Sequence, residues 1–159
     1  MEHISKYRLI EKLKEGGMGV IYRAEDRILG REIALKILEL DMAADKELHE
    51  RFLQEASLVG ALSHKNVVTI YDVGEDNGRL FIAMELLEGK DLKGLIQDRV
   101  PFSLEDKLRI LLEIGDGLAY AHRRGMVHRD IKPSNVFVCE TGTVKLLDFG
   151  LARLGISSL

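Results

Sequence analysis

The sequence has little cysteine or proline and no long hydrophobic run. Its single cysteine, Cys139, excludes an internal disulfide, and we expect a reducing, cytoplasmic compartment. The longest apolar stretch, residues 80–84, is far shorter than the roughly 20 residues that a membrane span needs. The first residues also lack the apolar core of a secretory signal. The sequence therefore predicts no membrane segment in this chain.

A large excess of one charge is also missing. Lysine and arginine number 23 and aspartate and glutamate 26, so the formal net charge is −3. This balance creates no electrostatic attraction for nucleic acid or for an anionic membrane surface, and we expect neither as a partner. With 46% apolar residues and only two prolines, the composition is that of a globular protein rather than a disordered one.

The first half of the chain has the patterns that are typical of strands and their turns. Five strands are expected, at residues 7–13, 20–25, 32–38, 67–73 and 79–84. A glycine-rich turn joins the first two strands, and a turn over residues 74–78 joins the last two. Between the third and fourth strands, apolar residues recur at helical spacing: Leu48, Phe52, Val59 and Leu62. The pattern predicts a five-stranded antiparallel sheet with one long helix.

The second half of the chain is predicted to be mainly helical. After a polar connection over residues 85–91, helices are expected at 91–98 and from Ser103 onward, where Ser103 is a typical N-cap. The second helix has a wide apolar face made of Leu104, Leu108, Leu111, Leu112, Leu118 and Ala119. Two short strands follow, at 136–138 and 144–147. The predicted fold class is therefore α+β, with a sheet-rich lobe followed by a helical one.

Glycines gather in the turn between the first two strands, as Gly16, Gly17 and Gly19. Because these residues lack Cβ atoms, such a turn lets backbone N–H groups approach phosphate oxygens. Taken alone, however, the same pattern fits an ordinary hairpin turn.

Two charged residues stand where apolar ones are expected. Lys36 interrupts an apolar strand, although a lysine at a strand edge can extend its ammonium group to solvent. Glu55 falls on the apolar stripe of the long helix, where an unpaired carboxylate is costly. We therefore expect Glu55 to pair with Lys36, which would place the ammonium group within reach of phosphate oxygens.

The loop HRDIKPSN, residues 128–135, places an acid, a cation and an amide together. Asp130 is able to accept a proton, Lys132 to neutralise charge on a transferring group, and Asn135 to bind a hard cation through oxygen. Asp148, directly after an apolar strand, adds a second oxygen ligand. Each group taken separately also fits a surface turn with scattered charges, but the ordered set does not.

Taken in order, these segments resemble the protein kinase family over essentially the whole chain. The matching segments are EGGMGVIYRA, IALKIL, the helix glutamate, HRDIKPSN and DFG. The lysine in HRDIKPSN is similar to that of the serine/threonine branch. The GGMG turn and VHRDIKPSNVFV together resemble the bacterial eukaryotic-like Ser/Thr kinases.

The resemblance implies a two-lobe, protein-kinase-like fold. Residues 1–84 would form the small lobe, 85–90 the hinge and 91–159 part of the large lobe. It also implies ATP and Mg²⁺ as cofactors, and transfer of the γ-phosphate of ATP to Ser or Thr hydroxyls of protein substrates.

The resemblance also assigns roles to single residues. Asp130 would orient or deprotonate the substrate hydroxyl, and Lys132 would stabilise charge on the transferring phosphoryl group. Lys36, paired with Glu55, would bind the α and β phosphates. The Mg²⁺ ligands would be Asn135 and Asp148. Contacts to the rest of the nucleotide would come from Gly16, Gly17, Gly19, Ile21, Ala34, Met84, Glu85, Leu87 and Phe137. An apolar column would link the lobes through Val59, Ile70, His128 and Phe149.

Two features depart from the family pattern. Lys14 stands where the glycine-rich turn of the family has its first glycine, and we expect backbone strain there. The chain also ends at Leu159, before the APE motif and the later helices of the family. The apolar face over residues 104–119 is therefore expected to be partly exposed and to favour self-association.

The sequence leaves three functions open. The leading interpretation is a truncated protein Ser/Thr kinase catalytic domain that retains its residues for chemistry. The first alternative is a nucleotide-binding module without transferase activity. The second is an inactive fragment of a longer kinase.

Overall fold

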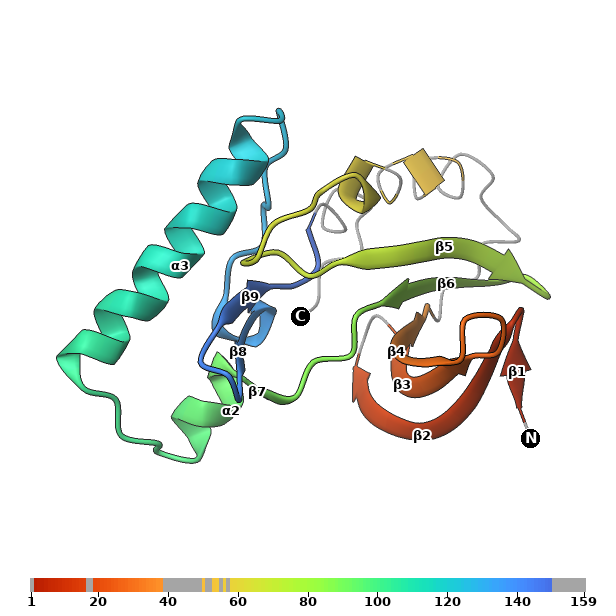
Figure 1. Cartoon of the computed structure of the whole chain (residues 1–159), viewed down its shortest axis with the longest axis horizontal. Coiled ribbons are helices and arrows are strands. Elements are labelled where there is room, and N and C mark those ends of the chain that lie inside the picture. Colours follow the sequence, from red (N-terminus) through yellow and green to blue (C-terminus); the bar gives the residue numbers. More distant parts are fainter. Residues whose placement is uncertain are drawn as a thin grey trace. The chain divides into compact units, whose positions relative to one another are not determined.

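The computed structural model describes residues 2–16, 19–38, 50, 53–54, 56 and 58–149 (Figure 1). These residues form two compact units. The first unit comprises the described residues of Met1–Ala61 together with Thr69–Leu86. The second comprises Leu62–Val68 and the described residues of Leu87–Gly150. The chain therefore enters the second unit twice.

The first unit is built on a six-stranded antiparallel sheet with the strand order β1-β2-β3-β4-β6-β5. Its strands are β1 His3–Ile4, β2 Tyr7–Gly16, β3 Gly19–Asp26, β4 Arg31–Ile37, β5 Ile70–Asp76 and β6 Arg79–Met84. Strands β2 and β3 are strongly curled (Figure 1). The predicted antiparallel sheet is confirmed, but it has one strand more than expected. The additional strand, β1, has two residues, which is too short for an alternating pattern to show.

The hairpin between β5 and β6 differs from its prediction. Strand β5 begins at Ile70 rather than Val67 and continues through Gly74 to Asp76, so the turn shrinks to Asn77 and Gly78. Both turn residues have positive φ, 51° and 76°, as the type I′ turn that Asn-Gly favours requires. Because β5 lies at the edge of the sheet, its polar residues pair with β6 while remaining partly exposed.

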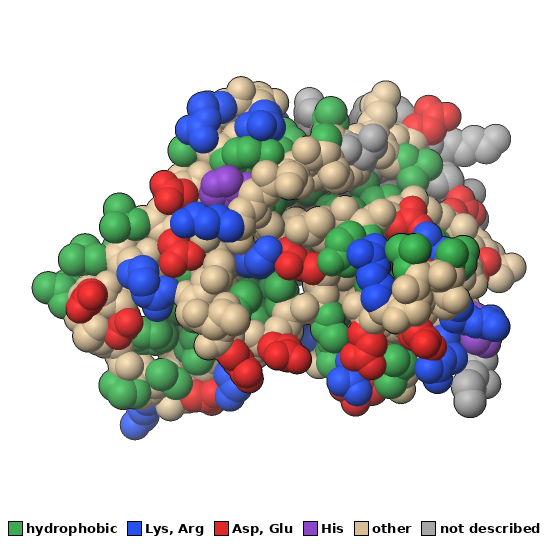
Figure 2. Space-filling model, in the orientation of Figure 1, with side chains coloured by type: hydrophobic (Ala, Val, Ile, Leu, Met, Phe, Trp, Pro, Cys, Tyr) green, Lys and Arg blue, Asp and Glu red, His purple; other side chains and the backbone are tan. Residues whose placement is uncertain are grey.

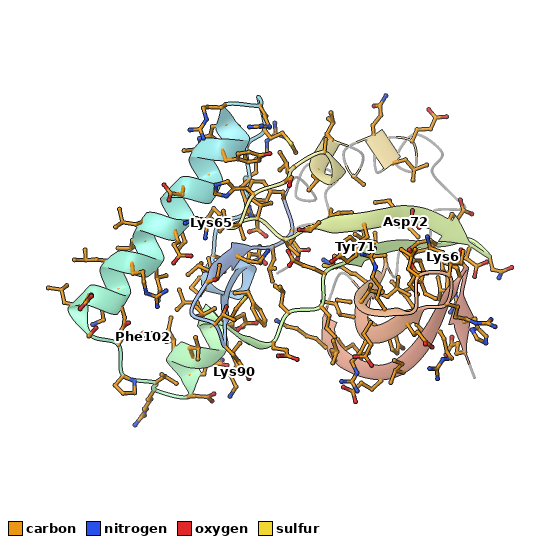
Figure 3. The ribbon with its side chains drawn as sticks, viewed as in Figure 1. Lys6, Lys65, Tyr71, Asp72, Lys90 and Phe102 are labelled. Atoms are coloured by element: carbon orange, nitrogen blue, oxygen red, sulfur yellow. The ribbon has the colours of Figure 1, made fainter. Side chains whose placement is uncertain are left out.

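A cluster of buried side chains forms a core in this unit. Its members are Ile4, Tyr7, Ala24, Ile33, Leu35, Ile37, Phe81 and Ala83. The Tyr7 ring meets Phe81 edge-on with 5.6 Å between ring centroids, and its hydroxyl donates to Asp72 at 2.8 Å. Burial and this hydrogen bond raise the pKa of Tyr7. The ammonium group of Lys6 lies 3.1 Å from the same carboxylate (Figure 3). The β1–β2 turn is thereby tied to β5.

The second unit combines a small sheet with helices. Its elements are β7 Gly89–Asp91, α2 Leu92–Gln97, α3 Leu104–His122, the 3-10 helix η2 Pro133–Asn135, β8 Val136–Cys139 and β9 Val144–Leu146. The three strands pair in the order β7-β8-β9. The predicted polar connection is therefore wrong over its last three residues, which form β7. Gly89 has φ +140°, and a Cβ there would lie 2.2 Å from the Val138 carbonyl oxygen, so this close pairing requires glycine.

Helix α3 begins at the predicted cap. The Ser103 hydroxyl accepts from the Asp106 N–H at 3.0 Å, and the Asp106 carboxylate accepts from the Ser103 N–H at 3.2 Å, which completes a capping box. Four leucines of the predicted apolar face are between 52% and 72% exposed: Leu104, Leu108, Leu111 and Leu112. Figure 2 shows hydrophobic side chains gathered over this helix. The expected exposure is confirmed. Within the described part of the chain, no helix is long and apolar enough to cross a membrane.

Candidate active site

The glycine-rich turn joins β2 to β3, and the ends of these strands pair through Gly16 and Gly19. Gly19 has φ +122°, and a Cβ there would lie 2.0 Å from the carbonyl oxygen of Ile37. The close approach of β4 therefore requires glycine at this position. A Cβ at Gly16 would meet nothing within 4 Å, so packing does not explain that glycine. The predicted phosphate contact Gly17 lies outside the described residues.

The strain expected at Lys14 is absent, and that prediction is wrong. Lys14 lies in β2 opposite Ile21, and it is not among the described non-glycine residues with positive φ. The strand register shifts between Lys12 and Lys14, as at a β-bulge. The strand therefore accommodates a side chain here with ordinary backbone angles.

Lys36 is buried in β4, with 4% of its surface exposed. It is flanked by Ile21 of β3 and Ile82 of β6. An ammonium group at this depth is costly unless it has a polar partner. Glu55, the partner that the sequence predicts, lies outside the described residues, so this pair stays a prediction.

Three predicted adenine contacts share one face of the sheet with Lys36. Residues two apart in a strand point to the same face, and so do residues that are directly opposite on neighbouring strands. Ala34 precedes Lys36 by two residues and pairs with Met84, and Ile21 pairs with Lys36. Strand register alone therefore collects these four side chains on one surface.

The other predicted adenine contacts lie after β6 and in β8. The Glu85 N–H donates to the Thr69 carbonyl at 3.0 Å, and the Glu85 carboxylate accepts from the Thr69 N–H at 2.7 Å. These two bonds hold Glu85 at the end of β6. Leu87 begins the next segment of the second unit, and Phe137 lies in β8 of that unit.

The catalytic-loop residues form a single polar cluster. The Lys132 ammonium group lies 2.9 Å from Asp130 Oδ2. The side-chain amide of Asn135, which is 4% exposed, donates to the same oxygen at 3.1 Å and to the Asp130 carbonyl at 2.9 Å. The structure thus brings together the acid, the cation and the amide that the sequence singled out.

The electrostatics of this cluster keep Asp130 ionised. Partial desolvation by itself would raise the pKa of the carboxyl group. The hydrogen bond and charge of Lys132, with the hydrogen bond from Asn135, outweigh it and lower the pKa of Asp130. Asp130 therefore carries a negative charge at neutral pH.

His128 links the loop to the end of β9. Its Nδ1 accepts the Asp130 N–H at 3.3 Å, so its Nε2 is the donor to the Leu147 carbonyl at 2.8 Å. The ring is 1% exposed and packs on Phe149 with 4.4 Å between centroids, as the predicted apolar column requires of this pair. Burial lowers the pKa of His128, which favours the neutral ring.

Two residues next to this cluster have left-handed backbone conformations. The φ angles are 67° at Arg129 and 56° at Asp148, a region that non-glycine residues seldom occupy. Such strain is found most often at functional sites. The Leu147 N–H donates to the Asn135 carbonyl at 2.9 Å, so Asp148 directly follows a residue that is hydrogen-bonded to Asn135.

The donor set of Asn135 and Asp148 fits a magnesium ion bound with a nucleotide. The Asn135 amide nitrogen is engaged with Asp130, so the atom that this side chain offers a cation is its carbonyl oxygen. Mg²⁺ is usually held by one or two carboxylates together with water and substrate phosphates. In the described part of the chain, no three His, Cys, Asp or Glu side chains gather as a metal site. An amide and a carboxylate therefore suit a cation that is shared with phosphates.

A second polar cluster, which was not predicted from the sequence, includes Asn66, Arg109 and Glu113. Glu113 lies on the buried side of α3, at helical spacing from Ile110 and Gly117. The signal that singled out Glu55 was a carboxylate at helical spacing from apolar residues. The sequence around Glu113 contains a similar signal.

The sequence matches the family model described as "Protein kinase domain" over residues 7–158, and the chain belongs to that family. The predicted kinase-like fold is thereby confirmed.

Its relatives include bacterial serine/threonine-protein kinases. PrkC of Bacillus subtilis (strain 168) is 42% identical over 147 residues, which cover 92% of this chain and 23% of that protein. PknL of Mycobacterium tuberculosis (strain ATCC 25618 / H37Rv) is 40% identical over 149 residues, covering 94% and 37%. A crystal structure of the Mycobacterium tuberculosis PknI kinase domain matches with a TM-score of 0.83 and 33% identity, covering 99% of this chain and 62% of that one. The chain therefore spans less than two thirds of each of these proteins.

Proposed function

We propose that the chain is the ATP-binding and catalytic-loop part of a protein serine/threonine kinase, which transfers the γ-phosphoryl group of ATP to Ser or Thr hydroxyls of proteins. The observation that carries this proposal is the cluster in which Lys132 and Asn135 both contact the carboxylate of Asp130. The proposal keeps residues 1–84 as the small lobe, 85–90 as the hinge and 91–159 as part of the large lobe, in a cytoplasmic protein.

Asp130 and Lys132 carry the chemistry in this proposal. The Asp130 carboxylate accepts a hydrogen bond from the substrate hydroxyl and orients its oxygen toward the γ-phosphorus. The new O–P bond forms as the bond between the γ-phosphorus and the bridging oxygen of ADP breaks, and the hydroxyl proton passes to Asp130. Because its pKa is lowered, Asp130 is a weak base and contributes mainly by orientation. Lys132 stabilises the charge on the transferring group.

The remaining candidate residues bind the nucleotide. Adenine lies against apolar side chains and the connection after β6, namely Ile21, Ala34, Met84, Glu85, Leu87 and Phe137. Lys36, paired with Glu55, holds the α and β phosphates beneath the turn formed by Gly16, Gly17 and Gly19. Asn135 and Asp148 would hold Mg²⁺, which supplies positive charge against the phosphates when it is bound.

Thermal unfolding with and without MgATP tests nucleotide binding. A ligand that binds only the folded state adds about 2.7 kcal/mol to the free energy of unfolding at 100 times its Kd. We expect MgATP to raise the Tm of the wild-type chain, and Lys36→Met and Asp148→Asn to abolish the shift. Asp116→Asn, an exposed change on α3, is the matched control and should keep it. An unchanged wild-type Tm would contradict nucleotide binding and favour the inactive fragment.

A phosphorylation assay on a Ser- and Thr-rich protein tests transfer. We expect phosphoserine or phosphothreonine in the substrate, and Asp130→Asn to lower the rate by about a hundredfold to ten-thousandfold. Asp116→Asn should again retain the wild-type rate. A chain that binds MgATP without transferring phosphate would instead be the non-catalytic nucleotide-binding module.

A further inference from the structure

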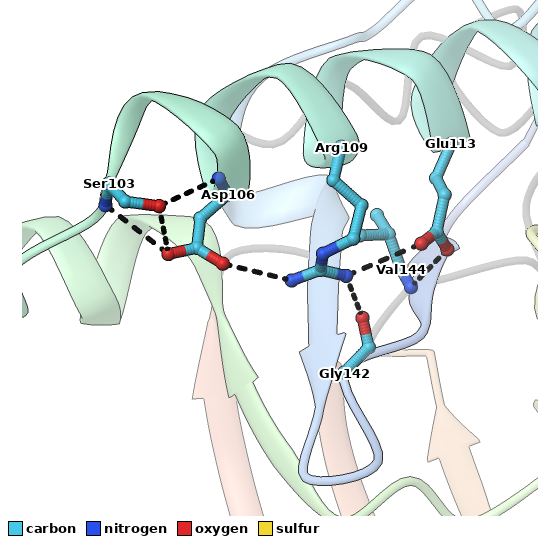
Figure 4. Close-up of polar contacts among 6 residues, drawn as sticks. All are labelled: Ser103, Asp106, Arg109, Glu113, Gly142 and Val144. Carbon is cyan, nitrogen blue, oxygen red and sulfur yellow. Dashed lines mark hydrogen bonds and ion pairs between the residues drawn. The ribbon is translucent and has the colours of Figure 1, made fainter.

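The carboxylate of Glu113 joins Arg109 to Val144 in a polar network of the second unit (Figure 4). Its Oε2 accepts from the Val144 N–H at 2.8 Å and from Asn66 Nδ2 at 2.7 Å. Its Oε1 accepts from Arg109 Nη1 at 3.3 Å. The Glu113 side chain is 17% exposed, so these bonds form in a largely water-excluded site. Oε2 is therefore occupied by donors from outside the helix, and Oε1 by Arg109 one turn earlier on α3.

Arg109 extends this network in two directions. Its Nη1 also donates to the Gly142 carbonyl in the β8–β9 turn, and its Nη2 lies 3.8 Å from Asp106 Oδ1 in the capping box (Figure 4). The guanidinium group therefore connects the first turns of α3 to the turn that leads into β9.

Asn66 shows how strongly the network sets side-chain positions. Its Nδ2 donates to Glu113 and also to the Val144 carbonyl at 2.8 Å. Its Oδ1 is buried and has no hydrogen-bond partner in the structure, which is costly. If the amide rotated by 180°, Oδ1 would face two acceptors, the Glu113 carboxylate and the Val144 carbonyl. The two donated hydrogen bonds therefore fix the orientation of the amide.

The network is hydrogen-bonded to β9, and this strand leads to the candidate metal ligands. Val144 opens β9, and the Leu146 N–H donates to the Asn66 carbonyl at 2.9 Å. At the other end of the strand, the Leu147 N–H donates to the Asn135 carbonyl at 2.9 Å, directly before Asp148. Glu113 therefore fixes the position of Val144 at the start of β9, and Asn135 is hydrogen-bonded to Leu147 just after its end.

We propose that Glu113, supported by Arg109, is a positioning residue for the candidate Mg²⁺ ligands Asp148 and Asn135. The inference rests on the proposed function for the identity of the ion. Charge and acceptor number matter more than packing, because a glutamine of the same shape would turn an NH₂ group toward the donors. Either Arg109 or the pair formed by Val144 and Asn66 would then lose its acceptor.

The test compares the wild-type chain with Glu113→Gln and Arg109→Gln, and uses Glu105→Gln, an exposed carboxylate near the start of the same helix, as control. A fluorescent ADP analogue is titrated in EDTA and then at increasing Mg²⁺. Glu113→Gln should raise the half-saturating Mg²⁺ concentration about tenfold, as loss of a group that orients a metal ligand does elsewhere. Nucleotide affinity in EDTA should not change. Arg109→Gln should raise the Mg²⁺ requirement by a smaller factor, and Glu105→Gln should not raise it.

Amide hydrogen exchange in the metal-free chain provides a second readout. In Glu113→Gln we expect faster exchange at Val144 and also at Leu147, where a merely local loss would affect Val144 alone. Unchanged exchange at Leu147 together with an unchanged Mg²⁺ requirement would overturn the proposal.

Different results would contradict the proposed function and the proposed role of Glu113. If the wild-type chain binds no nucleotide, the proposed function fails, and exchange at Leu147 alone decides the role of Glu113. If Glu113→Gln does not unfold cooperatively, Arg109→Gln decides in its place, because it removes a partly exposed side chain and leaves the carboxylate intact.

Discussion

The candidate residues fall into two groups that are held in place by different means. The sheet group consists of Ile21, Ala34, Lys36 and Met84. The loop group consists of Asp130, Lys132, Asn135 and Asp148. Strand register places the sheet group on one face of the sheet. Side-chain hydrogen bonds, an ion pair and a left-handed backbone hold the loop group. The first group therefore depends on backbone shape, and the second depends on single polar atoms.

The largest effect should come from disturbing the backbone beside the sheet group. Gly19→Ala would place a Cβ 2.0 Å from the Ile37 carbonyl oxygen at a positive φ, so β3 or β4 must move. We expect the free energy of unfolding, measured in urea, to fall by about 3 kcal/mol. Gly16→Ala, whose Cβ meets open space, should change it by less than about 0.5 kcal/mol. Equal losses of unfolding free energy in Gly19→Ala and Gly16→Ala would contradict the dependence of the sheet group on backbone shape.

The next largest effect should come from His128, whose ring accepts the Asp130 N–H in the loop group. Burial lowers the pKa of His128 from its ordinary value of 6.5, so the unfolded chain binds a proton that the folded chain resists. The free energy of unfolding should therefore fall as the pH drops below about 6.5, by up to about 1.4 kcal/mol per pH unit, until the folded-state pKa is reached.

His128→Phe removes this titration while keeping an aromatic ring against Phe149. We expect a shallower pH dependence of the unfolding free energy in this variant, and lower stability at neutral pH because the Leu147 carbonyl loses its donor. Parallel pH profiles for the two proteins would show that His128 does not titrate as its burial requires.

The smallest effect should have opposite signs at two arginines. Arg129 has φ 67°, so Arg129→Gly relieves a left-handed conformation, and we expect a gain of about 1 kcal/mol in the free energy of unfolding. Arg123, at the end of α3, has φ −60°, and Arg123→Gly should lose about 0.5–1 kcal/mol. Urea unfolding measures both changes. A loss at both positions would mean that the loop backbone is not strained.

The loop group was the easier group to predict from the sequence. Asp130, Lys132 and Asn135 lie within one short segment, so their proximity needed little tertiary information. Asp148 was found because it directly follows an apolar strand. The chemical types of these residues already pointed to proton transfer and to a hard cation, and the structure added the hydrogen bonds that join them.

Glu113 was harder to predict, although its sequence signal resembles that of Glu55. The leucine-rich side is the more apolar face of α3 by sequence, yet Leu104 is 72% exposed and Leu112 is 70% exposed. The buried side carries smaller residues, Gly117 and Ala121 among them. A Cβ at Gly117 would lie 2.8 Å from the Asn66 carbonyl oxygen, so close packing rather than side-chain size selects this face.

The family, the order of the segments and the residue types available for chemistry all follow from the amino-acid sequence, because each is encoded in short local patterns. Tertiary structure alone decided three features. Gly89 enters a strand beside β8, Lys14 takes ordinary angles opposite Ile21, and Glu113 joins α3 to β9. Each of these depends on how closely two separate segments of backbone approach, and that distance is set by packing rather than by any local pattern of residues.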